Sequence, residues 1–366
     1  MKYQSEFRDQ GLARGLLTAI RAAAARLPPI TIMEVCGSHT MAICRYGLRA
    51  VLPANVRLLS GPGCPVCVTA GHYIDQAVAL ARLPDVTLAT FGDLLRVPGS
   101  SSSLEKERAA GATIDIVFSP LQAVELAQAQ PQRRVVLLGI GFETTAPGVA
   151  LALRDAAGLG LRNFFVLCGH KVMPPPLRAL VAGRTHIDGF LLPGNVSAIL
   201  GLQPYGFLAS EFGTACVVAG FEPLDVLEGI HLLLHQAINR KPMVENQYTR
   251  LVRTDGNPAA RRLVDSVFEP RDAVWRGIGM IPGSGLRLRE EYAAHDAERS
   301  IACHTEPTVE KKGCVCGEIL QGLKQPEDCP LFGRACTPAD PVGACMVSSE
   351  GCCAAHFRYL RGTPGE

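Results

Sequence analysis

The chain has 366 residues with 36 basic and 34 acidic side chains, so its formal net charge is +2. This balance gives no broad basic field for nucleic acid and no acidic tail. The length and a hydrophobic fraction of 48% exclude a disordered chain and fit two or three folded domains. Fourteen cysteines is a high number at this length, and seven of them fall between Cys314 and Cys353.

The N-terminal part of the chain predicts an amphipathic helix over residues 7–27 and no secretory signal. The longest apolar runs, such as VVLLGIGF at 135–142, are much shorter than a membrane span. We therefore expect a cytoplasmic protein. In that reducing compartment, cysteines are better interpreted as metal ligands or redox groups than as a disulfide framework.

Short apolar, β-branched runs alternate with helical patterns between residues 30 and 240. The expected strands are 30–35, 56–60, 86–91, 113–118, 134–142, 163–168, 189–193 and 214–220. The expected helices are 40–52, 73–83, 121–130, 145–157, 176–182 and 224–239. Strands that are apolar throughout and alternate with helices indicate parallel sheets covered on both faces, so we predict an α/β fold.

The pattern divides the chain into four parts. A helix over 1–27 precedes a first α/β domain over 28–130 and a second, similar α/β domain over 131–245. The alternation then stops, and 246–366 forms a C-terminal domain whose tail is rich in Cys, Gly and Pro. Such a tail buries little apolar surface, so we expect a bound metal to hold its shape.

Polar motifs follow the expected strands, where ligands collect in open parallel sheets. CGSH at 36–39 follows the first strand, and a helix begins directly after Cys36. A helix N-terminus and the nearby His39 both predict a lowered pKa for the Cys36 thiol. A thiolate suits a nucleophile or a soft-metal ligand. The alternative is an ordinary buried thiol.

Two further motifs carry candidate chemistry. Cys64 and Cys67 form the only C-x-x-C of the chain, without a second pair to share zinc, which favours a dithiol/disulfide couple. Two unreactive turn cysteines are the alternative. Glu143 in GFETTAP (141–147) could orient a polar ligand, although the adjacent threonines would also serve as helix caps.

The C-terminal cysteines give the strongest signal. They are Cys314, Cys316, Cys329, Cys336, Cys345, Cys352 and Cys353. Their spacing is not that of a zinc ribbon, and four thiolates in irregular loops favour an iron–sulfur cluster, with zinc as the alternative. The chain contains no P-loop, G-x-S-x-G or H-E-x-x-H motif, so nucleotide, hydrolase and zincin functions lose support.

With these motifs assembled, the sequence closely resembles the HypD family of hydrogenase maturation factors. The matching segments are MEVCGSHTMAI, GPGCPVCV, TFGDLLRVPGS, VFSPLQAV, GFETTAP, FEPLDVLEGI, WRGIGMIPGSGL and the cysteine-rich tail. The resemblance implies two Rossmann-like α/β domains facing a cleft and a smaller domain with a 4Fe–4S cluster. It also implies a scaffold that assembles the Fe(CN)2CO group of nickel–iron hydrogenases with the small chaperone HypC and the cyanide donor HypE.

The resemblance also implies roles for individual residues. Cys36 would hold the iron of Fe(CN)2CO, in a loop that also contains His39, and Cys64 with Cys67 would be the redox pair. Glu143 belongs to a shared motif. The cluster ligands would be Cys329, Cys336, Cys345 and Cys353, with Cys352 as the alternative to Cys353 and with Cys314 and Cys316 as a second thiol pair. Cys44, Cys168, Cys216 and Cys303 remain as ordinary thiols.

The sequence departs from the family at two positions: Met41 replaces a second histidine, and Asn195 replaces the histidine of PGHVS. The expected function is a redox-active assembly scaffold rather than a conventional turnover enzyme. One alternative is an iron–sulfur thiol–disulfide oxidoreductase that acts on a protein disulfide. A zinc-stabilised binding module is the other.

Overall fold

The computed structural model describes residues 6–360. The expected N-terminal helix is shorter than 7–27: a 3-10 turn, η1 (Glu6–Arg8), precedes α1 (Gln10–Ala24). Helix α1 begins at Gln10 because the side chain of Asp9 accepts a hydrogen bond from the Leu12 N–H at 2.8 Å. The first five residues of the expected 1–27 segment and the last six of 246–366 lie outside the described residues.

All eight strands expected between residues 30 and 220 are present, which confirms that part of the sequence analysis. They are β1 (Ile30–Glu34), β2 (Val56–Ser60), β3 (Val86–Thr90), β4 (Ile114–Ile116), β5 (Arg134–Gly139), β6 (Phe164–Cys168), β7 (Gly189–Pro193) and β8 (Ala215–Ala219). A further short strand, β9 (Val244–Asn246), follows them.

The expected helices between the strands are present with small shifts at their ends, except that the expected helix over 40–52 is two helices, interrupted at Gly47 with a φ of 61°. They include α2 (Gly37–Arg45), α3 (Leu48–Val51), α5 (Gly71–Ala81), α7 (Pro120–Ala129), α8 (Ala146–Gly158), α9 (Pro174–Val181) and α12 (Pro223–Asn239). Shorter helices fill the loops: α4 (Pro65–Val68), η2 (Gly92–Arg96), α6 (Leu104–Ala109), α10 (Gly194–Leu200), η3 (Gln203–Tyr205) and α11 (Gly206–Ser210).

The strands form two parallel sheets, in the orders β2-β1-β7-β8-β9 and β4-β3-β5-β6. Each sheet draws strands from both sides of residue 130. The α/β class is therefore confirmed, but the units are not the contiguous stretches 28–130 and 131–245. The chain crosses from the first sheet to the second after β2 and returns after β6.

Both sheets are covered on their two faces. Ile32, Leu191 and Val217 of the first sheet pack outward, in a core with α1 and α12. Val135 and Leu137 of the second sheet pack outward in another core. The alternate residues of both sheets turn inward and join one continuous core, which also includes thiols of the C-terminal region.

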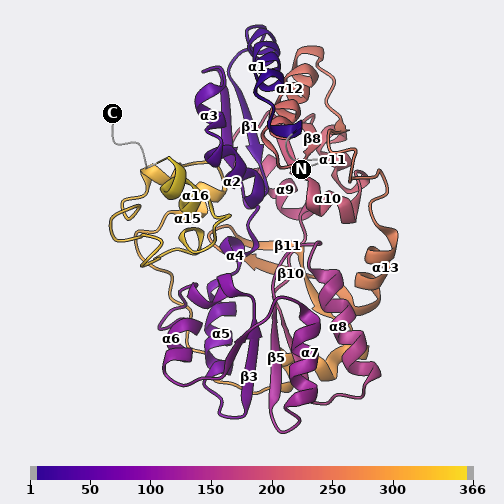
Figure 1. The fold of residues 1–366 in the computed structure, drawn as a ribbon, viewed down its shortest axis with the longest axis vertical. Coiled ribbons are helices and arrows are strands. Elements are labelled where there is room, and N and C mark those ends of the chain that lie inside the picture. Colours follow the sequence, from indigo (N-terminus) through magenta and orange to yellow (C-terminus); the bar gives the residue numbers. More distant parts are fainter. Residues whose placement is uncertain (1–5, 361–366) are drawn as a thin grey trace.

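An antiparallel hairpin lies between the two sheets (Figure 1). It consists of β10 (Phe268–Trp275) and β11 (Gly279–Leu288) and follows α13 (Pro258–Val267). The fully buried Trp275 packs against Phe142 with ring centroids 6.0 Å apart and donates from Nε1 to Ser284 Oγ. The hairpin therefore packs against Phe142, which follows β5 of the second sheet.

The cysteine-rich region lies beside this junction, next to α2 and α4 (Figure 1). Its short elements are α15 (Cys316–Leu320), η5 (Pro326–Asp328), η6 (Ala344–Met346) and α16 (Cys352–Tyr359), whereas the preceding η4 (Glu290–His295) and α14 (Ala297–Ser300) pack against β6. Helix α16 packs against α2, which follows Cys36. Within residues 6–360, none of the helices has the length and apolarity required to cross a membrane.

Candidate functional site

Cys36 lies at the switch point of the first sheet. β1 is flanked by β2 on one side and by β7 on the other, so the strand order reverses between β1 and β7. Ligands of open α/β sheets bind at this point, beyond the carboxyl ends of the strands. Cys36 follows β1 and Asn195 follows β7, and Cys36 Sγ lies 3.8 Å from Asn195 Oδ1. Asn195 is the position where the resemblance described above leads us to expect histidine.

The backbone around Cys36 is fixed by two neighbouring elements. The Cys36 N–H donates to Glu34 Oε2 at 3.1 Å, and Thr40 Oγ1 donates to the other oxygen of this buried carboxyl group. Gly63 of the GPGC motif packs directly on Cys36, where an added Cβ would lie 2.1 Å from the Cys36 nitrogen. Only glycine permits this approach, so the second loop also positions Cys36.

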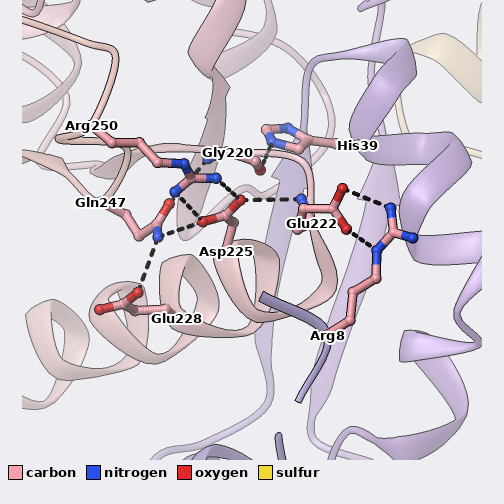
Figure 2. Close-up of polar contacts among 8 residues, drawn as sticks. All are labelled: Arg8, His39, Gly220, Glu222, Asp225, Glu228, Gln247 and Arg250. Carbon is pink, nitrogen blue, oxygen red and sulfur yellow. Dashed lines mark hydrogen bonds and ion pairs between the residues drawn. The ribbon is translucent and has the colours of Figure 1, made fainter. Parts of the chain in front are cut away.

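The structure contradicts the expected lowering of the Cys36 pKa. Cys36 is 4% exposed, and burial, together with the negative charge of Glu350, raises the thiol pKa to about 12. His39 supplies no positive charge, because burial lowers its own pKa to about 4. Its Nε2–H donates to the Gly220 carbonyl at 2.9 Å (Figure 2). The His39 side chain therefore positions α2, while the backbone N–H groups of His39 and Ser38 partly offset the rise in the Cys36 pKa.

The loop that receives His39 is held by a network at the start of α12 (Figure 2). The fully buried Asp225 accepts two hydrogen bonds from Arg250, at 2.5 and 2.7 Å. Gln247 donates to Asp225 and accepts from the Gly220 N–H. The remaining members drawn are Arg8, Glu222 and Glu228. This network fixes the Gly220 carbonyl, and through it the position of the Cys36 helix.

Cys64 and Cys67 lie at the ends of one helical turn. The Cys64 sulfur caps α4 by accepting a hydrogen bond from the Cys67 N–H at 3.3 Å. The Cys67 thiol interacts with the thiols of both Cys64 and Cys345, and burial raises its pKa well above the usual value. Both residues are buried, so the C-x-x-C pair faces the interior of the protein.

The thiol contacts continue into the C-terminal region. Cys345 Sγ lies 2.7 Å from Cys316 Sγ, and the Cys316 thiol also interacts with the Cys314 thiol. The sulfurs therefore form a continuous line from Cys64 through Cys67, Cys345 and Cys316 to Cys314. None of these sulfurs is bonded in a disulfide.

This line ends at a small hollow lined by six thiols. They belong to Cys314, Cys316, Cys329, Cys336, Cys345 and Cys353. Leu331, Phe332 and Met346 supply apolar walls, and the Val342 N–H donates to Cys336 Sγ at 3.3 Å. Among residues 6–360, no three His, Cys, Asp or Glu side chains form a site for one metal ion. The thiols instead surround a hollow.

The donor set fits a 4Fe–4S cluster, which is held by four thiolates. Cys316 Sγ and Cys345 Sγ are in contact with each other, and Cys314, Cys329, Cys336 and Cys353 line the rest of the hollow. Cys352 does not line the hollow; its thiol interacts with Ser60 and is close to Arg49. All four expected ligands, Cys329, Cys336, Cys345 and Cys353, therefore line the hollow, together with Cys314 and Cys316.

Glu143 follows β5 of the second sheet and lies apart from the line of thiols. Its Oε1 accepts a hydrogen bond from the Met173 N–H at 2.8 Å, while the buried Oε2 has no hydrogen-bond partner. Burial raises the pKa of this carboxyl group to about 7. The charge of Glu143 acts on the buried Tyr205, which is also near Cys36.

Two site residues were missed in the sequence analysis. Glu350 Oε1 accepts a hydrogen bond from Ser38 Oγ at 2.6 Å, beside Cys36. Two positions earlier, Ser348 Oγ donates to Asp93 Oδ2 at 2.8 Å, at the switch point between β3 and β5. The available signal was the serine and glutamate directly before the last two cysteines, in SSEGCC.

The remaining thiols lie outside the hollow. Cys44, Cys168 and Cys216 are buried, and Cys303 is partly exposed. The Cys168 thiol donates to the Leu286 carbonyl at 3.2 Å, and burial raises its pKa to about 12. Their surroundings are those of ordinary interior thiols.

The fold and the site together define a class: a protein with two parallel α/β sheets in which a line of thiols joins a cysteine-lined hollow to a switch point. The chain belongs to the HypD family, since the family model described as "HypD: Hydrogenase formation hypA family" matches residues 11–360.

Relatives with similar sequences carry the name hydrogenase maturation factor. The chain is 49% identical to hydrogenase maturation factor HypD2 of Bradyrhizobium diazoefficiens, over 99% of this chain and 97% of that protein. It is 49% identical to HypD of Rhizobium leguminosarum bv. viciae, over 99% and 96%. It is 43% identical to HypD of Escherichia coli, over 98% of both chains.

Proposed function

We propose that this chain acts in the maturation of nickel–iron hydrogenases, as the scaffold on which the Fe(CN)2CO group is assembled. Membership of the HypD family supports the process, because its relatives are named for it. The observation that carries the proposal is the line of thiols that runs from the six-thiol hollow to the C-x-x-C loop packed on Cys36. A conventional active site with an exposed nucleophile would not need such a line.

The iron of the Fe(CN)2CO group is the substrate, and Cys36 is its ligand in this chain. Cys36 lies at the switch point, between Asn195 and the loop of Gly63. Its raised pKa means that the free thiol keeps its proton, which the metal must displace when it binds. The chaperone HypC supplies a second thiolate, and HypE delivers cyanide.

In this proposal Cys314, Cys329, Cys336 and Cys353, which line the hollow, would hold a 4Fe–4S cluster there. When bound, it supplies electrons one at a time. The Val342 N–H, which donates to Cys336 Sγ, stabilises a thiolate at that position. Cys345 leaves the ligand set because its sulfur lies against Cys316 and Cys67.

Two thiol pairs connect the hollow to the loop beside Cys36, and the first of them, Cys316 with Cys345, lines the hollow itself. Each pair, Cys316 with Cys345 and Cys64 with Cys67, releases two electrons and two protons when it forms a disulfide. Cys67 contacts Cys345, so thiol–disulfide exchange can pass oxidation from one pair to the other. Reducing equivalents stored as dithiols therefore reach the loop beside Cys36.

The burial of the C-x-x-C pair argues against the alternative of a thiol–disulfide oxidoreductase for protein substrates. Cys64 is 3% exposed and Cys67 is fully buried, so a protein disulfide cannot reach either sulfur. Free, buried thiols suit the reducing cytoplasm, which is the location we assign.

The test is anaerobic purification of the chain with HypC and HypE, followed by metal analysis, visible absorbance and infrared spectroscopy. The wild-type complex should contain iron and show cyanide and CO bands. Cys36→Ala should lose these bands and keep the visible absorbance of the cluster. Cys44→Ala, on the same helix, is the control and should keep both. Unchanged infrared bands in Cys36→Ala would refute the assignment, and zinc without iron would favour a zinc-stabilised binding module.

A further inference from the structure

Two histidines on the surface of α12 form a pair that the site described above does not use. His231 and His235 are one helical turn apart, and their Nε2 atoms lie 3.1 Å from each other. Their ring centroids are 4.5 Å apart, with the ring planes at 81°. His231 is half-buried and His235 is exposed, so solvent reaches the point between the two nitrogens.

This spacing is that of two nitrogens on one metal ion. Bonds of 2.0–2.1 Å from a shared ion to nitrogens 3.1 Å apart enclose an angle of about 98°. That angle lies between the values for octahedral and tetrahedral coordination, so either geometry requires only small side-chain rotations. In the absence of metal, one ring donates its Nε2–H to the other, and a bound ion would replace this shared proton.

The surroundings favour a cation. Burial and the neighbouring His235 lower the pKa of His231, which keeps its imidazole neutral and able to coordinate. Glu228, one turn before His231, places a carboxylate close enough to act on the His231 ring. One of its oxygens accepts from Gln247 at 3.0 Å, so its position is fixed (Figure 2).

We propose that His231 and His235 chelate a divalent ion of the late first transition row, with water completing the coordination. Imidazole nitrogen is a good donor for Ni²⁺, Cu²⁺ and Zn²⁺. The site is separate from Cys36, because His235 lies ten residues beyond Asp225, about 15 Å along the helix at 1.5 Å per residue. The proposal is independent of the proposed function.

The histidine pair also has a structural consequence for α12. A metal that bridges residues one turn apart fixes the middle of the helix that packs against α1. Because the ion binds only the folded helix in this way, it raises the free energy of unfolding with the logarithm of one plus the ratio of its concentration to the dissociation constant. Metal binding can therefore be followed by stability as well as by stoichiometry.

The test uses Ni²⁺, since imidazole suits this ion and soft thiolates favour other metals. Untagged, cluster-loaded chain is applied anaerobically to a Ni²⁺ chelating resin and eluted with an imidazole gradient. Wild type should be retained, and His235→Ala should elute early. His186→Ala is the matched control, because His186 is an exposed single histidine that lies 2.9 Å from Asp188. It should elute with the wild type.

Solution measurements complete the test. Equilibrium dialysis should show one Ni²⁺ fewer per chain in His235→Ala, or binding at least about tenfold weaker, because one imidazole replaces a two-donor chelate. The thermal midpoint of the wild type, but not of His235→Ala, should rise with Ni²⁺. His235 is exposed, so this variant should fold, which circular dichroism verifies. Wild-type flow-through, or equal Ni²⁺ binding by wild type and His235→Ala, would overturn the proposal.

Discussion

Glu350 accepts a hydrogen bond from Ser38 at 2.6 Å, across 312 positions of the chain. This contact attaches the cysteine-rich region to the first turn of the Cys36 helix. The approach is close: an added Cβ on Gly37 would lie 2.6 Å from the Glu350 Cβ. With Ser348 bound to Asp93, residues 348–350 connect the switch points of both sheets.

Replacing Glu350 by alanine should therefore loosen the C-terminal region. Ser38 loses its acceptor, and the expected loss is about 1–3 kcal/mol in the free energy of unfolding. Urea unfolding followed by circular dichroism measures this change. Glu350→Gln is the matched variant, since its amide oxygen can still accept from Ser38, and it should lose less. Equal losses in both variants would show that the charge, and not the hydrogen bond, holds the segment.

Gly63 should tolerate no side chain. A Cβ at this position would lie 2.1 Å from the Cys36 nitrogen, so Gly63→Ala must displace one of the two loops. We expect a loss of about 1–3 kcal/mol or more in unfolding free energy, and loss of the infrared cyanide bands.

Gly15→Ala is the control for this substitution. Gly15 lies within α1 with no neighbouring atom within 4 Å of an added Cβ, so this variant should be about 0.5–1 kcal/mol more stable. Wild-type stability and bands in Gly63→Ala would disprove the close packing of the two loops.

The strands β1 to β8 could be predicted because they are short, mainly apolar runs bounded by turn residues, whereas the polar edge strand β9 (Val244–Asn246) was missed. The pairing of these strands could not be predicted from the sequence. β1 pairs with β7, which is far along the chain, and the apolar pattern of a buried parallel strand is the same whichever neighbour it has. The hairpin of β10 and β11 was missed because Pro270, Pro282 and a bulge after Arg271 interrupt its alternation.

Like the fold, the candidate site has some features that could be predicted from local sequence and others that could not. Cys36 and the C-x-x-C pair could be placed at strand ends from local sequence, because strand ends are local features. The pKa of Cys36 could not be predicted, since it depends on burial by Glu350 and other residues remote in sequence. The choice between Cys314 and Cys345 depends on which sulfurs face each other, and spacing does not contain that information.

The ligand set can be tested by serine substitutions at these cysteines. Cys314→Ser should lose most of the visible absorbance of the cluster, whereas Cys345→Ser should keep it and should lose one redox-active thiol pair in a thiol titration. Cys352→Ser is the control, because this thiol faces Ser60 and not the hollow. Loss of absorbance in Cys345→Ser, with retention in Cys314→Ser, would restore the set expected from the sequence.

Glu143 should make stability depend on pH. Burial raises its pKa in the folded protein from 4.5 to about 7. Below pH 4.5 the carboxyl group is protonated in both the folded and the unfolded state, so its burial does not lower the free energy of unfolding. As pH rises from 4.5 to 7, the unfolded state loses its proton first, and stability falls. Above pH 7 the loss in the free energy of unfolding is constant, at about 3 kcal/mol for a pKa shift of this size.

Glu143→Gln should remove this cost, because the amide carries no charge at any pH while its oxygen can still accept from the Met173 N–H. The variant should match the wild type near pH 4.5 and exceed it at pH 8 by up to about 3 kcal/mol, as measured by urea unfolding at both values. Glu310→Gln, on the surface, is the control and should show no such difference. If Glu143→Gln and the wild type lose stability in parallel between pH 4.5 and 8, Glu143 is ionised in the folded protein and has a charged partner.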